Sequence, residues 1–355
     1  MTKLTELLNY VVDQHCSDLH LSTGEKPIVR KSGDLFRLDA PELTNDDVKN
    51  IIKEMTSPEQ FQDLEKNLEL DFSYGLGNIC RFRVNAFYQS RGLSASLRTL
   101  SFSIPKMEDI HLTNPIFKSV CEYPNGLILV TGATGSGKST TLASMINHIN
   151  EMESSREHII TIEDPIEYIF KSKLCLIQQR EVGKDTKAFQ NALRAALRED
   201  PDIIMVGEMR DLETIRLALT AAETGHLVFG TLHTSSAAHA IDRIVDVFPG
   251  NEKDMIRAML AESLRVVIAQ RLLKTPGGGI MPAHEVLVCT SAVRNLIREH
   301  KIAQMYSAMQ TGRQYGMQTM DQHINELLES NQIIQTEAIQ LEHGEHSNEQ
   351  GEDVN

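Results

Sequence analysis

The chain has 355 residues, a hydrophobic share of 41% and a formal net charge of −14 at pH 7. Its length predicts about two domains at the usual ~100–200 residues each, and no apolar run approaches the ~18–20 residues of a membrane span. The acidic balance argues against non-specific nucleic-acid binding, which depends on a basic surface. The five cysteines are scattered without a C-x-x-C pair, which favours buried thiols over disulfides or a zinc site.

Residues 1–100 predict a separate α+β domain. Leucines and valines from Leu4 to Val12 have helical spacing, and polar residues interrupt this first helix, so we expect no signal peptide and a cytoplasmic protein. A second helix is expected over Thr44–Glu65, where the segment from Thr44 to Asp47 resembles a cap. We expect residues 101–114 to be a linker. Strands are predicted at Ser17–Ser22, in a hairpin over Pro27–Leu38, and at Leu68–Tyr74, Cys80–Tyr88 and Leu93–Leu100.

From residue 115 onward, predicted strands alternate with predicted helices. Repeated βα units indicate an α/β core over residues 115–290 with a mostly parallel, doubly wound sheet, whose ligand lies at the carboxyl ends of the strands. Residues 291–341 should be helical, ending in a helix over Asp321–Leu341, and the acidic tail 342–355 should be disordered. The predicted strands are Leu127–Val130, His158–Glu163, Asp202–Val206 and His226–Leu232, and the predicted helices Thr140–Ile149, Thr186–Glu199, Leu212–Glu223, Ala237–Val247 and Glu252–Leu272.

The segment Gly132–Ser139 fits the P-loop pattern G-x-x-x-x-G-K-[ST] between a buried strand and a helix. Glycines let several backbone N–H groups face one anion, and the helix adds its positive N-terminal end. We expect Lys138 to reach the β- and γ-phosphates of ATP and the Ser139 hydroxyl to hold Mg²⁺. The alternative is a loop that only turns the chain. The expected ATP-binding residues are Gly132, Ala133, Thr134, Gly135, Ser136, Gly137, Lys138, Ser139 and Thr140.

Two acidic clusters follow predicted strands. Glu163 and Asp164 are candidates for holding Mg²⁺ through water or for polarising the attacking water; the alternative is a solvated turn. Glu208 ends a strand of Walker B form and is the first choice for activating water, whereas the alternative is a helix-capping carboxylate. His233, at the carboxyl end of its strand, is a candidate γ-phosphate sensor, and His226, at the opposite end, a candidate structural residue.

In this order, the motifs resemble the GspE-type secretion/type IV pilus ATPase superfamily, and within it the twitching-motility retraction ATPases. The resemblance covers nearly the whole chain. It rests on the P-loop GATGSGKST, the Asp box TIEDPIEY, the Walker B and His box block from Arg198 to Thr234, and the C-terminal segment SAVRNLIRE. Val293 replaces the isoleucine of the family's last motif, a conservative change that we expect to be tolerated.

The resemblance implies a homohexameric ring of subunits with a PAS-like N-terminal domain and a RecA-like P-loop domain, with ATP and Mg²⁺ bound between them. It makes Glu163 the Asp-box carboxylate, Glu208 the catalytic glutamate, and His226 and His233 the His-box residues. Ala292–Glu299 would serve retraction rather than hydrolysis. On strands of the N-terminal region, Arg83 and Arg98 match the family's arginine pair and Arg81 is a third candidate; all three could equally form a polar face.

The function we expect is ATP-driven retraction of a type IV pilus, at the inner face of the inner membrane. The implied partners are the pilus platform protein and a paralogous retraction ATPase. The rivals are an accessory retraction-type paralogue and an extension or secretion ATPase. Extension and secretion ATPases usually carry a longer N-terminal region and a four-cysteine insert, neither of which the chain shows. A nucleic-acid translocase and a nucleotide-binding regulator without hydrolysis are alternatives from other classes.

Overall fold

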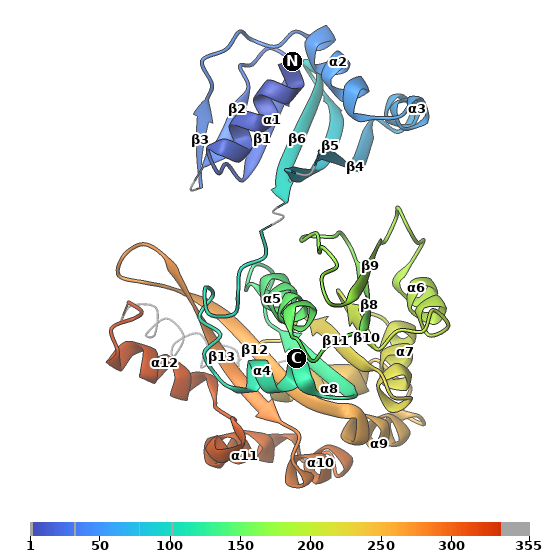
Figure 1. The fold of residues 1–355 in the computed structure, drawn as a ribbon, viewed down its shortest axis with the longest axis vertical. Helices are drawn as coiled ribbons and strands as arrows, with labels where there is room; N and C mark the ends of the chain where they lie inside the picture. The colour runs from blue at the N-terminus through green and yellow to red at the C-terminus, as the bar shows by residue number, and fades with distance from the viewer. Residues whose placement is uncertain (1–2, 32, 78, 101–102, 335–355) are drawn as a thin grey trace, which may run out of the picture. The chain divides into compact units, whose positions relative to one another are not determined.

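The computed structural model describes residues 3–31, 33–77, 79–100 and 103–334. Its contacts divide the chain into two compact units (Figure 1). The first is formed by Met1–Ser103 with Glu167–Ile169, and the second by Ile104–Ile166 and Phe170–Asn355. Within the described ranges, no helix has the length and apolar character needed to cross a membrane.

The first unit is an antiparallel sheet in the order β3-β2-β1-β6-β5-β4. The strand predicted at Cys80–Tyr88 is confirmed as β5, in which Phe82, Val84 and Ala86 are buried in a core shared with Leu19 and Leu97, whereas Tyr88 is exposed. The strands are β1 (Asp18–Ser22), β2 (Ile28–Lys31), β3 (Asp34–Arg37), β4 (Glu69–Leu76), β5 (Cys80–Gln89) and β6 (Gly92–Leu100), and the helices α1 (Lys3–Asp13), α2 (Asn45–Met55) and α3 (Pro58–Asn67).

The single helix predicted over Thr44–Glu65 is wrong, because two helices occupy this segment. Thr44 caps α2 as expected. Ser57 then caps α3: its side chain accepts a hydrogen bond from the Gln60 N–H, and the Gln60 side chain accepts one from the Ser57 N–H. Pro58 occupies the first turn of α3, and a proline disfavours helical geometry in the preceding residue. The chain therefore breaks at Thr56–Ser57.

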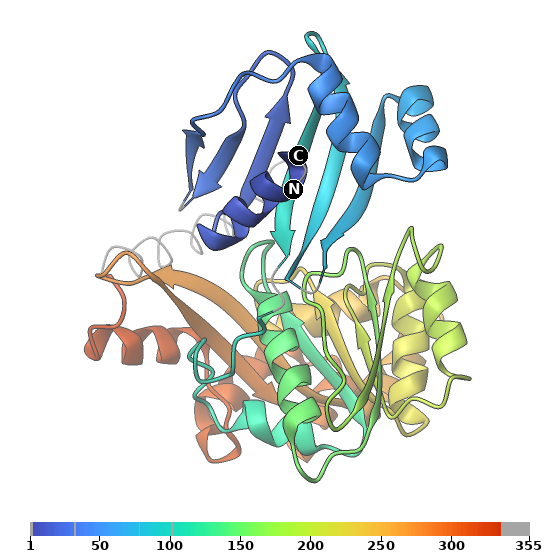
Figure 2. The same ribbon diagram turned by 45° about the horizontal axis from the view of Figure 1, so that its top comes forward.

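The second unit holds a seven-stranded sheet in the order β13-β12-β7-β11-β10-β8-β9, parallel except for β13. On one face, Leu127 and Leu129 pack in a core with α6, α7, α8 and α9, and α5 covers the other face (Figure 2). The strands are β7 (Gly126–Thr131), β8 (His158–Glu163), β9 (Leu176–Glu181), β10 (Ile203–Val206), β11 (Leu227–Leu232), β12 (Leu264–Lys274) and β13 (Ile280–Val288). The helices around them are α4 (Ile116–Ser119), α5 (Lys138–Glu151), α6 (Phe189–Ala196), α7 (Leu212–Glu223), α8 (Ala237–Asp246) and α9 (Lys253–Ser263).

The helix predicted over Glu252–Leu272 is wrong beyond Ser263. The chain leaves α9 there and enters β12, which lies parallel to β7 and forms an antiparallel hairpin with β13. A continuous apolar run can be a buried helix or a buried strand, and the β-branched stretch Val266–Ile268 decides for the strand. Strand β9 at the sheet edge was not predicted either, because its sequence LIQQRE is largely polar.

The C-terminal part of the described chain contains α10 (Ser291–Arg298), α11 (Met305–Thr311) and α12 (Met320–Glu329). Thr290 caps α10, its side chain accepting a hydrogen bond from the Val293 N–H. The helix predicted over Asp321–Leu341 is too long, since α12 ends at Glu329. The remainder of that prediction from residue 335, and the whole tail 342–355, lie outside the described residues.

Candidate active site

The P-loop follows β7, a strand whose six residues are all buried. Gly132, Gly135 and Gly137 have φ of +144°, +81° and +88°, a region that L side chains rarely adopt. A Cβ on Gly132 would lie 2.4 Å from the Gln270 carbonyl oxygen, and one on Gly137 would lie 2.7 Å from Gln270 Nε2. Both positions therefore require glycine for backbone conformation; Gly132 also requires it for space, and a side chain at Gly137 would displace the Gln270 amide.

Lys138 begins α5 directly after this loop. Its Nζ donates hydrogen bonds to the carbonyl oxygens of Gly132, at 2.7 Å, and Ala133, at 2.9 Å, so the ammonium group lies over the loop. Two hydroxyls in the same segment, Thr131 Oγ1 and Ser136 Oγ, are buried without a hydrogen-bond partner in the part of the chain that the structure describes. A cationic loop at a helix N-terminus, with spare buried hydroxyls, fits an anionic phosphate ligand and its Mg²⁺.

Glu163 ends β8 and is 7% exposed. Its Oε1 accepts hydrogen bonds from Thr161 Oγ1 at 2.6 Å and from Gln179 Nε2 at 3.1 Å. These bonds hold a buried carboxylate in one orientation. The following residue, Asp164, is exposed. Gln179 lies on β9, so the sequence could not place it beside Glu163 once that strand had been missed.

Glu208 follows β10, and His233 follows the adjacent strand β11. His233 Nε2 lies 2.9 Å from Glu208 Oε1. The same oxygen accepts a hydrogen bond from Arg210 Nε, and this bond to Glu208 raises the pKa of the Arg210 guanidinium above its ordinary value. The structure thus brings two predicted site residues into direct contact and adds Arg210, which the sequence analysis did not single out.

The strand order places all these groups at one edge of the sheet. Strand β11 lies between β7 and β10, and β8 follows β10. The register pairs Thr131 with Leu232, and Val206 with both Gly230 and Ile162, so the strands end at the same edge, within about two residues of one another. Neighbouring strands are ~4.8 Å apart. The loops that carry Glu208 and Glu163 therefore leave the sheet about 10 and 15 Å along this edge from the P-loop strand.

A family model described as "Type II/IV secretion system protein" matches residues 2–353. The chain belongs to the type II/IV secretion system protein family. It is 57% identical over 318 residues to the type IV pilus retractation ATPase PilT of Pseudomonas aeruginosa, covering 90% of this chain and 92% of that protein. It is 37% identical over 335 residues to the type IV pilus ATPase PilU of the same organism, covering 94% of this chain and 87% of that protein.

The solved structures agree with the sequence matches. The crystal structure of the pilus retraction motor PilT and bound ADP matches with a TM-score of 0.89 and 48% identity, covering 96% of this chain and 97% of that one. These findings confirm the predicted resemblance to the secretion/type IV pilus ATPase superfamily, the α/β fold class and the ATPase class.

The structure does not bring His226 to the edge that carries the P-loop. His226 precedes β11, whereas His233 follows it, and six strand residues span about 20 Å. The Nδ1 atom of His226 lies 2.9 Å from the Ala221 carbonyl oxygen and 3.3 Å from Thr224 Oγ1, both at the C-terminal end of α7. These contacts fit the structural role that the sequence analysis gave as one reading of this residue.

The three candidate arginines lie on the sheet of the first unit. Arg83 and Arg98 are directly opposite each other in the β5–β6 register, and both are exposed. Arg98 Nε donates to Asp18 Oδ1 at 3.0 Å, and the Arg81 guanidinium donates to Ser73 Oγ at 2.8 Å. Of this opposed pair, Arg98 is paired with Asp18, whereas no ion pair to Arg83 occurs among the residues that the structure describes.

Proposed function

We propose that the chain hydrolyses ATP to power retraction of a type IV pilus, as a homohexamer. The observation that carries this proposal is the shared sheet edge: P-loop, Glu163, Glu208 and His233 follow the carboxyl ends of parallel strands at the same edge of the sheet. The similarity to PilT, whose name specifies pilus retraction, supports the biological role. The 57% identity to PilT, against 37% to PilU, favours PilT-like retraction over the accessory alternative.

Each site residue has a chemical role in this proposal. Lys138 and the N–H groups of the P-loop bind the β- and γ-phosphates, and Ser139 is the hydroxyl ligand for the metal. Mg²⁺, when bound with ATP, neutralises charge on the phosphate oxygens. Glu208 orients the water that attacks the γ-phosphorus, while the bond from that phosphorus to the β-phosphate oxygen breaks. Glu163, whose carboxylate is fixed by Thr161 and Gln179, is proposed to hold the metal through water.

His233 is proposed to connect the γ-phosphate with Glu208. Its Nε2 already contacts Glu208 Oε1, and an imidazole can exchange one hydrogen-bond partner for another without leaving its strand end. Loss of the γ-phosphate would then change the position of the carboxylate. His226, which contacts the end of α7, is proposed to hold the amino end of the same strand.

The first unit is proposed to supply arginines to a nucleotide bound by a neighbouring subunit. Arg83 and Arg98 form a cationic pair on one face of a sheet, and a polyphosphate can accept hydrogen bonds from both guanidinium groups. Arg81 is a third candidate. We propose a PAS-like domain over residues 1–100, a linker over 101–114, a RecA-like core over 115–290 and a helical region over 291–341.

The proposed location is the cytoplasmic face of the inner membrane, where the hexamer would act on the platform protein of the pilus, with a paralogous retraction ATPase as a further proposed partner. Segment Ala292–Glu299, which includes most of α10, is proposed to serve retraction rather than hydrolysis. ATP and ADP must favour different arrangements of the ring, because a ligand that binds two states equally shifts no equilibrium.

Deletion of the gene in a piliated host tests the role directly. Hyperpiliated, non-motile cells support retraction, and bald cells would instead indicate an extension ATPase. Complementation with the wild-type chain should restore twitching, whereas a Glu208→Gln chain produced at the same level should not. Normal motility with that variant would contradict the assignment of Glu208. DNA-stimulated turnover would revive the nucleic-acid translocase.

A further inference from the structure

We infer that Gln270 is a positioning residue for the P-loop, holding one peptide of the phosphate cradle in its binding orientation, with His284 fixing Gln270 in turn. Gln270 lies on β12, outside every motif that points to nucleotide chemistry, and is 3% exposed. The inference rests on the proposed role of Gly132–Thr140 as the phosphate-binding loop.

The amide group of Gln270 joins the P-loop to α5. Its Nε2 donates to the Ser136 carbonyl oxygen at 2.7 Å, and its Oε1 accepts from Thr141 Oγ1 at 2.7 Å. A carbonyl oxygen can only accept, so the contact with Ser136 fixes which end of the amide carries the nitrogen. The carbonyl oxygen of Gln270 itself lies beneath Gly132, at the opposite end of the loop.

The bond to Ser136 determines the direction of a peptide dipole in the loop. In a planar trans peptide, the C=O and N–H bonds point in opposite directions. Since the Ser136 oxygen faces Gln270, the N–H of Gly137 points away from Gln270. Gly137 is also the N-cap of α5, so its N–H belongs to the group of donors that a phosphate would meet at the start of this helix. A reversed peptide would present a carbonyl oxygen there and repel the anion.

His284 fixes the other side of the Gln270 amide. The two residues are direct partners in the β12–β13 register, and His284 Nε2 lies 3.2 Å from Gln270 Oε1. Because Oε1 can only accept, the imidazole must carry its hydrogen on Nε2. Burial, with a smaller contribution from the charge of His323, lowers the pKa of His284 to about 3, so the ring is neutral at physiological pH.

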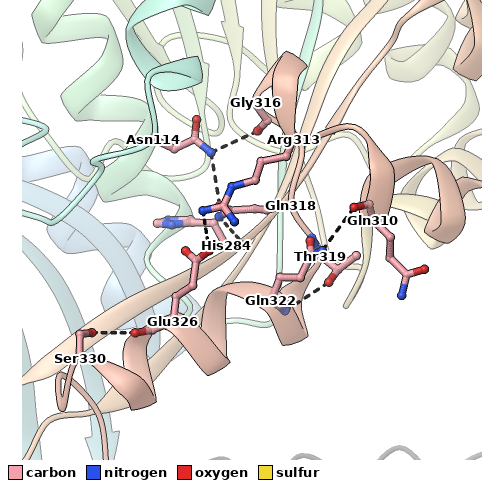
Figure 3. A network of polar contacts seen from close by, with 10 residues as sticks. All are labelled: Asn114, His284, Gln310, Arg313, Gly316, Gln318, Thr319, Gln322, Glu326 and Ser330. Carbon is pink, nitrogen blue, oxygen red and sulfur yellow. Dashed lines mark hydrogen bonds and ion pairs between the residues drawn. The ribbon is translucent and has the colours of Figure 1, made fainter.

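The position of His284 is itself fixed by surrounding contacts. Its backbone N–H donates to His323 Nδ1, and its carbonyl oxygen accepts from Gln318 Nε2, both at 2.9 Å. Phe117 meets its ring edge-on, with centroids 4.9 Å apart, and His323 stacks on it at 5.7 Å. Figure 3 shows Gln318 beside His284, within a polar network that extends along α12 to Ser330. A rigid second layer of this kind is what a positioning residue requires.

Steady-state kinetics of the full-length chain test the inference. Gln270→Met keeps the length of the side chain and removes the donor to Ser136. Without that donor the Gly137 N–H would no longer be held toward the phosphate. KM for Mg·ATP and the dissociation constant for ADP should therefore rise on the order of tenfold to a hundredfold, the range for a lost hydrogen bond to a charged group such as phosphate. Its kcat should change little, because the cradle binds ground state and transition state alike. An unchanged KM would overturn the inference.

A double-mutant cycle separates positioning from general stability. His284→Leu should raise KM less than Gln270→Met and should have no further effect in the Gln270→Met background, because His284 acts through Gln270. Additive effects would contradict this relay. If Gln270→Met does not fold, Thr141→Val offers a milder change, since it removes one of the two donors to Gln270 Oε1. It should raise KM by less than tenfold, and an unchanged value would overturn the inference.

Lys138→Ala, measured in parallel, distinguishes two failures. If Lys138→Ala still binds ADP normally, the proposed phosphate site is wrong. If Lys138→Ala abolishes binding while Gln270→Met and His284→Leu bind ADP as the wild type does, the site stands and only the positioning role fails.

Discussion

His233 Nε2 and Glu208 Oε1 are 2.9 Å apart, although the two residues come from loops after different strands of the sheet. Strands β10 and β11 are hydrogen-bonded neighbours, with Val206 opposite Gly230. Parallel pairing therefore brings both loops to the same place. The contact makes the orientation of the proposed catalytic carboxylate depend on a histidine that no local motif places beside it.

Replacement of His233 should affect turnover more than binding. We expect His233→Ala to lower kcat on the order of tenfold to a hundredfold, because the orienting donor to Glu208 is lost. The dissociation constant for ADP should stay within about twofold of wild type, since binding rests on the P-loop. His239→Ala, an exposed histidine on α8, is the matched control. Equal kcat values for the two variants would contradict the proposed role.

The P-loop glycines allow a comparison of two similar substitutions. Gly135 and Gly137 both have positive φ, but a Cβ on Gly135 meets no atom within 4 Å, whereas one on Gly137 would lie 2.7 Å from Gln270 Nε2. Each alanine variant pays a left-handed backbone penalty of about 1–2 kcal/mol. Gly137→Ala should additionally displace Gln270, so its free energy of unfolding and its ADP affinity should fall further than those of Gly135→Ala. Urea unfolding and ADP titration measure both quantities.

Loss of an arginine from the first unit should reduce turnover without removing nucleotide binding. If Arg83 and Arg98 act on a neighbouring nucleotide as arginine fingers do, Arg98→Ala should lower kcat on the order of 10³-fold. Arg91→Ala is the control, because Arg91 is exposed in the same unit and pairs with Glu25 instead. Mixing Arg98→Ala chains with Glu208→Gln chains should restore part of the activity if arginine and glutamate act across subunits. No recovery would argue for action within one chain.

Acid should destabilise the second unit through His284. An unfolded histidine has a pKa of about 6.5, whereas burial lowers the pKa of His284 to about 3 in the folded chain. Between these two pKa values only the unfolded state takes up a proton. The free energy of unfolding is therefore highest above pH 6.5 and decreases as the pH falls below that value. The loss at pH 5.5 should be about 1.4 kcal/mol.

Urea unfolding at pH 7.5 and 5.5 measures this difference. In His284→Leu, the difference in the free energy of unfolding between the two pH values should shrink by about the same 1.4 kcal/mol. The His239→Gln control should keep the wild-type difference. An unchanged pH dependence in His284→Leu would assign the acid sensitivity to other groups.

Elements with a clear period were predictable from the sequence. The amphipathic helix α7 and the β-branched strand β8 occur with the predicted bounds, Leu212–Glu223 and His158–Glu163. The hairpin of β12 and β13 was not predicted, because the short apolar run Val266–Ala269 has no period to distinguish strand from helix; the signal that was missed is its β-branched residues. Strand β9 was missed for the opposite reason, since a polar sheet edge lacks the apolar pattern of a strand.

Motifs located the candidate site, but its contacts depend on the tertiary fold. The P-loop glycines, Glu163 and Glu208 were identified because each directly follows a predicted strand. Gln179 and Gln270 lie on the two strands that were missed. Their positions beside Glu163 and the P-loop follow from strand order, which spacing along the sequence does not specify.

In the proposed function, ATP bound at the P-loop is hydrolysed with the help of Glu208. The most direct test measures ADP binding and ATP turnover in purified wild-type, Lys138→Ala and Glu208→Gln chains. We predict that Lys138→Ala loses both, and that Glu208→Gln binds ADP as the wild type does but turns over at least 100-fold more slowly, within the range for loss of an acid–base group. Wild-type turnover by Glu208→Gln, or normal ADP binding by Lys138→Ala, would contradict the account.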